Sequence, residues 1–403
     1  MPPVSRKCSM ETLYLKRGED RRLRAGHLWV FSNEVDVKRS PLGALLPGQA
    51  VNVADAADRI LGTAYVNPAS LIAARLVSRR PDSPLDADLV RSRLKDALAL
   101  RQRLFPEPFY RLCHGEGDWL PGLVVDRHGD HLVAQVSTAG MDRLTPSIVD
   151  ILSDMLHPAS LLLDNDIPSR DLEALPRGVK NALGTVPEAV DVMENGLTYS
   201  APLSRGQKTG WFYDQRDNRA ALIPFAPGAT VLDAFCYAGG FGALTLRHGA
   251  RAAAFADASA TALDFARRNA ERAAPHADIE CLHGDALSTL AQLRREGRRF
   301  DLVCLDPPAF IKRRKDARQG LEAYRRLNEL GLDLVKPGGA LMTCSCSHHL
   351  DAETLRGLAA KAAARRHIPL RLLRQGFQGA DHPIHPSMPE SAYLKTFLFQ
   401  ILA

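Results

Sequence analysis

The sequence predicts an α/β protein in three parts: a small β-barrel over residues 11–80, a mixed α+β segment over 81–200, and a parallel sheet with helices over 201–403. Two observations predict this organisation. Short apolar segments that alternate with polar residues and turns fill the first part, which is typical of a barrel. From about residue 207, apolar strands, glycine turns and helices of about 12 residues follow one another, which is the pattern of βαβ units.

Charged residues make up 24% and hydrophobic residues 45% of the chain, as expected of a water-soluble globular protein. We expect no membrane span, because no apolar run reaches about 18 residues. We expect no secretory signal either, because the first ten residues lack an apolar core. The seven cysteines are odd in number and scattered, so we expect a reducing, cytoplasmic location.

The net charge is +6. The positions of the basic residues along the chain say more about a binding partner than the net charge does. One basic cluster lies within residues 1–31 and another within 312–318, beside the motif at 306–308 described below. A solvated face explains either cluster alone, but the two together favour a nucleic-acid partner. The basic residues of the clusters are Arg6, Lys7, Lys16, Arg17, Arg21, Arg22, Arg24, Lys312, Arg313, Arg314, Lys315 and Arg318.

The elements before the parallel sheet are predicted from local patterns. The barrel segment 11–80 is followed by a polar, proline-bearing stretch at 80–88 that reads as a linker. Residues 88–105 are amphipathic and predict a helix. Apolar runs on either side of a turn predict hairpins at 122–137 and 189–203. We find no catalytic motif in this part of the chain.

The segment VLDAFCYAGGFG (231–242) places a glycine-rich turn directly after a strand that ends at Asp233. Gly239, Gly240 and Gly242 would let the backbone approach a ligand, and the following helix N-terminus offers free N–H groups. Dinucleotide-binding oxidoreductases share this feature, so the turn alone does not separate the two classes of protein.

The next three strands separate the two classes. The second strand ends in Asp257, 24 residues after Asp233, where a carboxylate can bind both ribose hydroxyls. The third delivers Asp285 to a position that can meet an adenine edge. The fourth ends in Asp306-Pro307-Pro308, for which a dehydrogenase has no use.

This series of motifs resembles that of class I S-adenosylmethionine-dependent methyltransferases. The resemblance implies S-adenosylmethionine as cofactor, with Asp233 and the glycine turn beside its methionine part, Asp257 beside its ribose and Asp285 beside its adenine. The cofactor-binding residues that we expect are Gln215, Arg216, Asp233, Phe235, Tyr237, Ala238, Gly239, Gly240, Asp257, Ala258, Ser259, Asp285, Ala286 and Asp306.

The two prolines after Asp306 stiffen the backbone and have no N–H to donate. In methyltransferases this motif contacts the base that receives the methyl group, so the resemblance implies that Asp306 orients that base. The RNA-contacting residues that we expect are Arg21, Arg22, Pro307, Pro308, Phe310, Lys312, Arg313 and Arg314.

A narrower resemblance comes from SRGQKTGWFYDQRDNRAAL (204–222), which includes Lys208. It is similar to the G-x-K-T-G-x-x-x-D-Q-R segment of bacterial 23S ribosomal RNA 5-methylcytosine methyltransferases of the RlmI type, and the similarity covers nearly the whole chain. It implies an N-terminal PUA-type RNA-binding barrel, a middle α+β domain and a Rossmann-like catalytic domain. It also implies 23S ribosomal RNA or a precursor of the large ribosomal subunit as partner, and a homodimer.

The stretch LMTCSCSHHL (341–350) holds two cysteines one residue apart and two adjacent histidines. These four side chains are too crowded for tetrahedral zinc from one strand, and we expect no metal. Side chains alternate along a strand, so Cys344 and Cys346 should share one face. They could be inert core residues, because free cysteine is among the most buried residue types.

Cytosine chemistry favours a nucleophile instead. Carbon 5 is a poor nucleophile until a thiolate adds to carbon 6 and turns the ring into an enamine. The T-C-S context of the wider superfamily matches Cys344, whereas the S-C-S context of the RlmI type matches Cys346, which we prefer as the catalytic residue. The base that removes the carbon-5 proton is open between water and His348.

Two other functions remain open. An RNA methyltransferase acting on an exocyclic amine, such as guanine N2, would explain Phe310 after the two prolines and needs no cysteine. A non-catalytic RNA-binding or ribosome-assembly factor would bind the cofactor without turnover. The loop at 378–395 either lines the base pocket or lies on the surface.

Overall fold

The computed structural model describes residues 10–203 and 210–402. The chain forms two compact units: one runs to Val186 and also includes Asp381–Ser391, and the other comprises Pro187–Ala380 with the residues from Ala392 onward. None of the described helices has both the length and the apolar character needed to span a bilayer. The residues of the sequence predictions that lie outside the described ranges are Arg6, Lys7 and Lys208.

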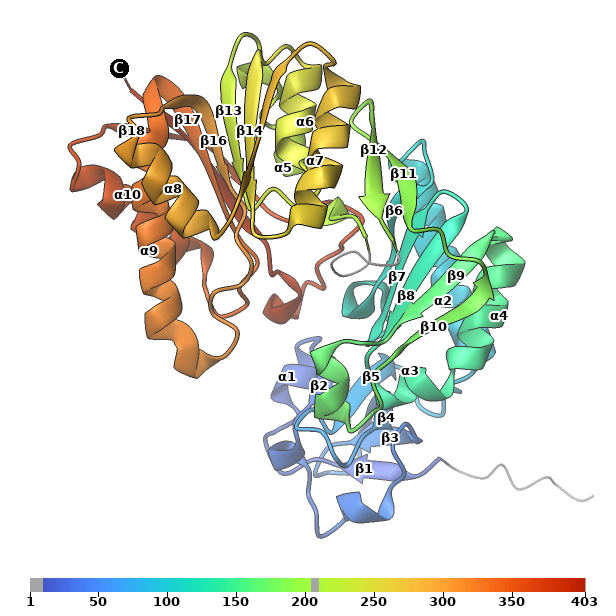
Figure 1. The fold of residues 1–403 in the computed structure, drawn as a ribbon. Helices are drawn as coiled ribbons and strands as arrows, with labels where there is room; N and C mark the ends of the chain where they lie inside the picture. The colour runs from blue at the N-terminus through green and yellow to red at the C-terminus, as the bar shows by residue number, and fades with distance from the viewer. Residues whose placement is uncertain (1–9, 204–209, 403) are drawn as a thin grey trace, which may run out of the picture. The chain divides into compact units, whose positions relative to one another are not determined.

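The first unit begins with the small sheet that the alternating pattern predicts (Figure 1). Its described strands follow the order β1-β3-β4-β5-β2, with β1 parallel to β3 and the other neighbours antiparallel. Leu13, Val51 and Leu76 are fully buried in its core. The elements are β1 (Thr12–Tyr14), α1 (Arg21–Arg24), β2 (Trp29–Val30), β3 (Ala50–Ala54), β4 (Ile60–Val66) and β5 (Ala74–Ser78).

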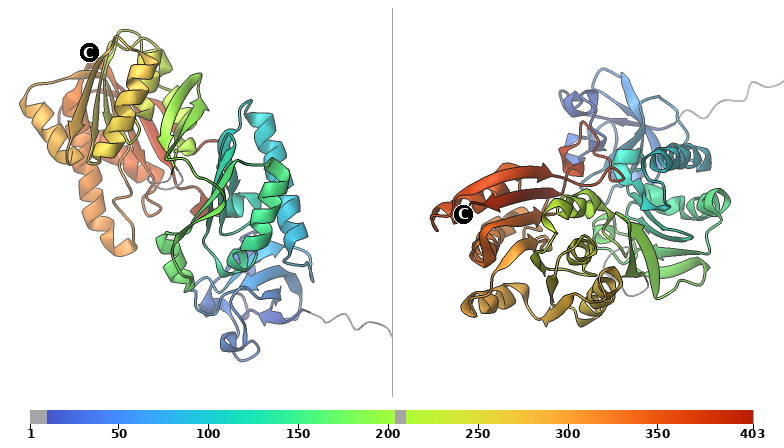
Figure 2. Two further views of the ribbon diagram at one scale, coloured as in Figure 1. Left: turned by 45° about the vertical axis from the view of Figure 1, so that its right-hand side comes forward. Right: turned by 90° about the horizontal axis from the view of Figure 1, so that it is seen from above.

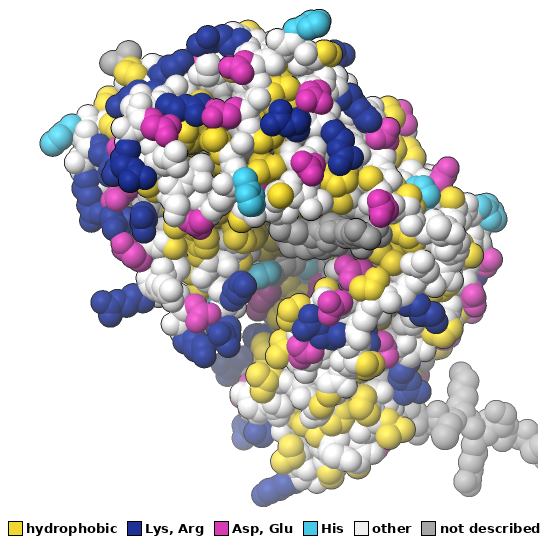
Figure 3. Space-filling view, viewed as in Figure 1, with side chains coloured by type: hydrophobic (Ala, Val, Ile, Leu, Met, Phe, Trp, Pro, Cys, Tyr) yellow, Lys and Arg dark blue, Asp and Glu magenta, His cyan; other side chains and the backbone are white. Residues whose placement is uncertain are grey.

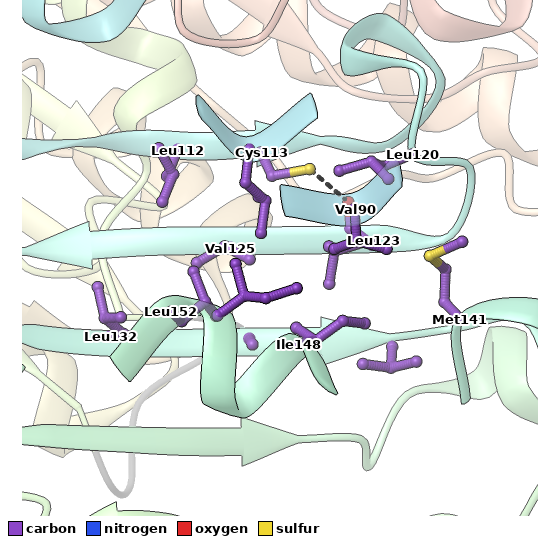
Figure 4. Packing of buried hydrophobic residues seen from close by; sticks show 14 of the residues in the cluster. Val90, Leu112, Cys113, Leu120, Leu123, Val125, Leu132, Met141, Ile148 and Leu152 are labelled. Carbon is purple, nitrogen blue, oxygen red and sulfur yellow. Dashed lines mark hydrogen bonds between the residues drawn. The ribbon is translucent and has the colours of Figure 1, made fainter. Parts of the chain in front are cut away.

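A second sheet of the same unit has the order β10-β9-β8-β7-β6 and includes the predicted hairpin β7–β8. Ile148 and Leu152 of α4 pack against Leu123 and Val125 of β7 (Figure 4). The Cys113 thiol also lies in this core and donates to the Leu123 carbonyl at 3.4 Å. The elements are α2 (Ala87–Leu104), β6 (Phe109–His114), β7 (Leu123–His128), β8 (His131–Val136), α3 (Ala139–Arg143), α4 (Thr145–Leu156), β9 (Ser160–Asp164) and β10 (Val179–Gly184).

The segment 381–391 returns from the C-terminal part of the sequence into this unit. The guanidinium of fully buried Arg101 holds Asp118 with two hydrogen bonds of 2.6 and 2.7 Å and donates to the Asp381 carbonyl at 2.8 Å. The side chain of Met388 is buried in the core of the first sheet. Of the two alternatives for this loop, a surface loop does not describe Asp381 and Met388, whose buried side chains complete a core far away in sequence. That the loop lines the base pocket stays a prediction.

The second unit is a sheet covered by helices on both faces (Figures 1 and 2). Helices α5, α6 and α7 lie on one face and α8, α9 and α10 on the other, and the hairpin β11–β12 packs against α7. The elements are β11 (Ala189–Glu194), β12 (Leu197–Pro202), α5 (Arg216–Ala220), β13 (Thr230–Ala234), α6 (Gly240–Arg247), β14 (Ala252–Asp257), α7 (Ala260–Ala273), β15 (Asp278–His283), α8 (Ala286–Arg295), β16 (Phe300–Leu305), α9 (Ala317–Leu334), β17 (Val335–Ser345), α10 (Ala352–Ala364), β18 (Leu370–Gly376) and β19 (Lys395–Ile401).

The strand order within the described residues is β15-β14-β13-β16-β17-β19-β18. The strands from β15 to β17 pair in parallel, whereas β19 is antiparallel to both of its neighbours. A dinucleotide-binding sheet of six parallel strands has no such reversed strand. The order turns back between β13 and β16, which is where open α/β sheets bind ligands.

The glycines of the predicted turn are required by contacts within the protein. A Cβ on Gly242 would lie 2.3 Å from Cε1 of Phe255, and one on Gly239 would lie 2.9 Å from the backbone of Ala266 in α7. Gly239 also has a φ of +76°, which disfavours other residues. Gly239 and Gly242 thus make room for a neighbouring helix and strand, and their contact with a ligand stays a prediction.

The contact at Gly242 yields a stability prediction. Gly242→Ala should lower the free energy of unfolding by about 1–3 kcal/mol, because the new methyl group overpacks the Phe255 ring. Gly357→Ala is the matched control: Gly357 lies in α10 with open space around it, and alanine favours a helix by about 1 kcal/mol. Urea unfolding of the two variants should move in opposite directions. Equal shifts would contradict the packing role of Gly242.

Candidate active site

Three carboxylates meet at one edge of the sheet of the second unit. Asp233 is the penultimate residue of β13, Asp257 ends β14, and Asp306 directly follows β16. β13 lies between the other two strands, and the Asp306 N–H donates to the Ala234 carbonyl at 3.3 Å. Parallel neighbours end on the same side, so the sheet brings these three predicted residues together.

The turn after β13 is strained and firmly held. Phe235 and Tyr237 adopt φ values of 60° and 49°, a region that non-glycine residues occupy at a cost of about 1–3 kcal/mol each. Asp257 offsets part of this cost by accepting the N–H groups of Tyr237 at 3.0 Å and Ser259 at 2.9 Å. Strain of this kind concentrates where a backbone is shaped around a ligand.

Asp233 is the most perturbed of the three carboxyl groups. It is fully buried; its Oδ2 accepts the Gly242 N–H at 2.9 Å, and its Oδ1 has no hydrogen-bond partner among the described residues. Burial raises the pKa of Asp233 to about 8, and the charges of Asp306 and Asp257 act in the same direction. The positive charge of Arg219 acts against this shift but does not cancel it, so the carboxyl groups of the site are left with a deficit of positive charge.

This charge deficit fits the cofactor that the motifs imply. S-adenosylmethionine carries a sulfonium and an ammonium group, and a cation beside Asp233 would restore its ionised form. The hydroxyls of a ribose could reach the remaining lone pairs of Asp257, since each oxygen accepts one hydrogen bond within the protein. Asp233 and Asp257 would thus hold the cofactor.

Other residues predicted for the cofactor have structural tasks as well. Oδ2 of Asp285 caps α8 by accepting the N–H and hydroxyl of Ser288 at 2.9 and 2.8 Å. Gln215 is buried, and its side-chain Oε1 accepts a hydrogen bond from the side-chain amide of Asn218 at 2.7 Å. Ala258 offers its carbonyl to the ring of His283 at 3.0 Å. The adenine contact of Asp285 stays a prediction.

A buried ion pair that the sequence did not reveal supports the segment before β13. Arg219 donates to Glu194 at 2.6 Å and to the Phe212 carbonyl at 2.7 Å. The other oxygen of Glu194 accepts the indole N–H of Trp211 at 3.0 Å and lies 3.8 Å from Arg216. Glu194 comes from the β11–β12 hairpin, so only the folded sheet shows the pairing.

The two cysteines occupy different environments. β17 ends at Ser345, so Cys344 lies within the strand and Cys346 immediately after it. Cys344 is buried, its sulfur accepts the Thr396 hydroxyl at 3.4 Å, and burial raises the pKa of the Cys344 thiol well above its usual value. Cys346 is half-buried. The prediction that the strand includes both cysteines is wrong, because β17 ends one residue before Cys346.

The residues after Asp306 connect to the cysteine segment. Pro307 is buried and Pro308 exposed. The ring of Phe310 lies 4.8 Å from that of Tyr324 and 6.3 Å from that of Phe235, centre to centre. The next residue, Ile311, donates its N–H to the Ser347 hydroxyl at 3.2 Å. This packing fixes the Asp-Pro-Pro segment to the residues on either side of Cys346.

The basic residues Lys312, Arg313 and Arg314 are exposed beside this segment. On the face drawn in Figure 3, lysine and arginine side chains are interspersed with acidic ones. Among the described residues, no group of three or more histidine, cysteine or acidic side chains is arranged to hold a metal ion.

Comparison with known proteins identifies the family. Residues 13–79 match the PUA-like domain family, and residues 177–400 match the S-adenosylmethionine-dependent methyltransferase family. Over 400 residues the chain is 33% identical to ribosomal RNA large subunit methyltransferase I of Erwinia tasmaniensis, which covers 97% of this chain and 99% of the relative. The chain belongs to this methyltransferase family.

Further comparisons agree with this membership. Ribosomal RNA large subunit methyltransferase I of Pseudoalteromonas translucida is 34% identical over 395 residues, covering 96% of this chain and 99% of the relative. A Streptococcus mutans structure that its name assigns to the SAM-dependent methyltransferases matches with a TM-score of 0.81 at 21% identity, covering 97% and 100%. The predicted fold class, family and S-adenosylmethionine cofactor are confirmed.

The raised pKa of Asp233 yields a prediction for cofactor binding. Near pH 7 most of this carboxyl group is protonated, and a bound cation lowers its pKa, so binding should release a proton and tighten from pH 6 to pH 8. Calorimetry in buffers of different ionisation enthalpy measures the release. Asp233→Asn should lose that contribution, which separates it from titration of the cofactor's own amino group. Equal proton release in both proteins would contradict this role of Asp233.

Proposed function

We propose that this enzyme methylates carbon 5 of a cytosine in large-subunit (23S) ribosomal RNA, with Cys346 as nucleophile and Asp306 orienting the base. The relatives are named ribosomal RNA large subunit methyltransferase I, which supports the substrate class. A structural relative was crystallised with S-adenosylhomocysteine, which supports the cofactor site. The observation that carries the mechanism is the half-buried Cys346 at the end of β17, the neighbour of the strand that delivers Asp306.

Bound S-adenosylmethionine supplies an electrophilic methyl group. The Cys346 thiolate attacks carbon 6 of the cytosine, forming a carbon–sulfur bond and moving the electrons of the 5,6 double bond toward carbon 5. Asp306 accepts a hydrogen bond from the exocyclic amine and, in its protonated form, donates one to the ring nitrogen, which makes the ring more electrophilic. Once carbon 5 carries its new methyl group, a base takes the carbon-5 proton, the double bond re-forms and the thiolate leaves.

The different surroundings of the two cysteines support Cys346 over Cys344. A nucleophile needs access to the substrate and an appreciable thiolate fraction. Cys344 has neither, because it is buried and its pKa is raised well above the usual value. It is the penultimate residue of β17 and is buried like a core residue.

The two arginines of α1 that are predicted to bind RNA differ in what they contact. Arg22 donates to Glu34 at 2.7 Å and lies over the Phe31 ring, 4.7 Å from its centre. The neighbouring Arg21 is exposed. We therefore assign the phosphate contact to Arg21 and a structural task to Arg22.

Nucleoside mass spectrometry tests the reaction. Unmodified large-subunit ribosomal RNA incubated with cofactor and wild-type enzyme should yield 5-methylcytidine, and Cys346→Ala should abolish it, because carbon 5 is no longer activated. Cys344→Ala is the matched control and should retain most of the activity. Methylguanosine that persists in both variants would favour the exocyclic-amine reaction, and no methylated nucleoside at all would favour an assembly factor.

RNA binding at several salt concentrations tests the two arginines. Arg21→Ala should weaken binding and reduce the slope of log K against log salt by about one, as expected for one lost phosphate contact. Arg22→Ala should instead lower the melting temperature, because Glu34 is left with a buried, uncompensated charge. If Arg21→Ala leaves the salt slope unchanged, Arg21 makes no phosphate contact.

A further inference from the structure

A buried lysine lies beside the cysteine turn. Lys395 is the first residue of β19 and pairs directly with Ser345 of β17. Only 9% of its surface is exposed, and its ammonium group donates to the carbonyls of Ser347 at 2.6 Å and Tyr393 at 2.8 Å. Lysine is rarely buried without a charged partner. Among the described residues, no carboxylate lies within ion-pair distance of this ammonium group.

The groups that act electrostatically on Lys395 are Cys346 and Asp351, the residue that caps α10. Burial lowers the pKa of Lys395 to about 8, whereas Cys346 and Asp351 oppose this effect. The lysine therefore remains mostly positive at neutral pH, within electrostatic reach of the Cys346 sulfur. Its two carbonyl partners hold the ammonium group in place, and a third N–H remains to face a neighbouring acceptor.

The opposite side of the turn is held by neutral groups. The Tyr324 hydroxyl accepts from Ser345 at 2.8 Å and lies 2.9 Å from the Ser347 hydroxyl, so it links the residues on either side of Cys346. Burial raises the pKa of Tyr324, and that of Cys344 is raised well above its usual value, so both stay uncharged. His348 follows on the same turn, with its ring 5.8 Å from that of Tyr393.

We propose that Lys395 is a positioning residue whose fixed positive charge stabilises the thiolate of Cys346 and so prepares it to attack the base. The thiol proton leaves to solvent while the ammonium group keeps its own protons. The negative charge of the Cys346 thiolate and the positive charge of the Lys395 ammonium group then balance each other until the sulfur bonds to carbon 6. This inference rests on the proposed function, because it takes Cys346 as the nucleophile.

Alkylation by iodoacetamide tests the inference without RNA or cofactor. Mass spectrometry of the peptide that carries Cys346 gives its alkylation rate from pH 5.5 to 10 in the wild type, Lys395→Gln and Lys395→Arg. Glutamine can still donate to the two carbonyls but carries no charge. The Lys395→Gln rate at pH 7 should fall about tenfold or more, as expected when an opposite charge is lost. Lys395→Arg should restore part of it.

A purely structural role predicts a different result. If Lys395 only shapes the turn, Lys395→Gln should change the rate at every pH, including the plateau near pH 10 where the thiol is fully ionised. A changed midpoint with an unchanged plateau supports the electrostatic role. A midpoint equal to that of the wild type overturns it. Circular dichroism confirms that each variant is folded before its rates are compared.

RNA containing 5-fluorocytosine separates this inference from the proposed function. Fluorine at carbon 5 cannot leave as a proton does, so a cysteine nucleophile becomes trapped as a covalent protein–RNA adduct. If Lys395 controls alkylation but the wild type forms no adduct, the electrostatic pairing stands and the proposed reaction fails. If the adduct forms and alkylation is indifferent to Lys395→Gln, the reaction stands and the role of Lys395 fails.

Discussion

The hydrogen bond from the Gly242 N–H to the buried carboxyl group of Asp233 ties the turn after β13 to the strand that precedes it. Three constraints meet there: β14 must pack closely enough that Phe255 touches Gly242, the turn must adopt left-handed conformations, and Asp233 must lose its water. The last two of these are unfavourable by themselves. They persist together because the surrounding sheet and helices hold the turn.

A buried ion pair supports the residues beside this edge of the sheet. A buried carboxylate beside others is tolerable only where other charges are neutralised, and Glu194 is neutralised by Arg219. That pair also fixes Trp211 and the Phe212 carbonyl, so the segment leading to Gln215 is held by contacts to the β11–β12 hairpin. The hairpin thus supports the cofactor side of the sheet although it contributes no strand to it.

Prediction from the sequence succeeded where a feature depends on neighbours along the chain. The strand–turn–helix units around Asp233, Asp257 and Asp306 are local patterns, and their convergence follows from parallel pairing alone. The end of β17 before Cys346 was missed because pairing with β19 decides it. Lys395 lies 50 residues after Ser345, and the reversed strand that brings them together leaves no local trace in the sequence.

The glycine turn and the loop at 378–395 also show where prediction from the sequence fails. The sequence does not distinguish a glycine beside a ligand from a glycine beside a phenylalanine ring. Only the structure therefore reveals the contact between Gly242 and Phe255. Likewise, polar residues such as Asp381 and His382 suggest a surface, but here they are buried by partners such as Arg101 and Arg111. Arg22 is a third case, since a basic cluster does not show which of its members is already paired.

The two ends of the loop at 378–395 are held by residues that connect to the lysine beside the cysteine turn. The chain leaves the second unit after Ala380 and re-enters it at Ala392. Asp214 holds both ends, because its carbonyl accepts the Gly379 N–H at 2.9 Å and its carboxylate accepts the Tyr393 hydroxyl at 2.6 Å. The Tyr393 carbonyl in turn accepts from Lys395. Tyr393 is therefore one hydrogen bond from Lys395, Asp214 two and Gly379 three, so the residues that anchor the loop and the lysine beside the cysteine turn form one connected set of contacts.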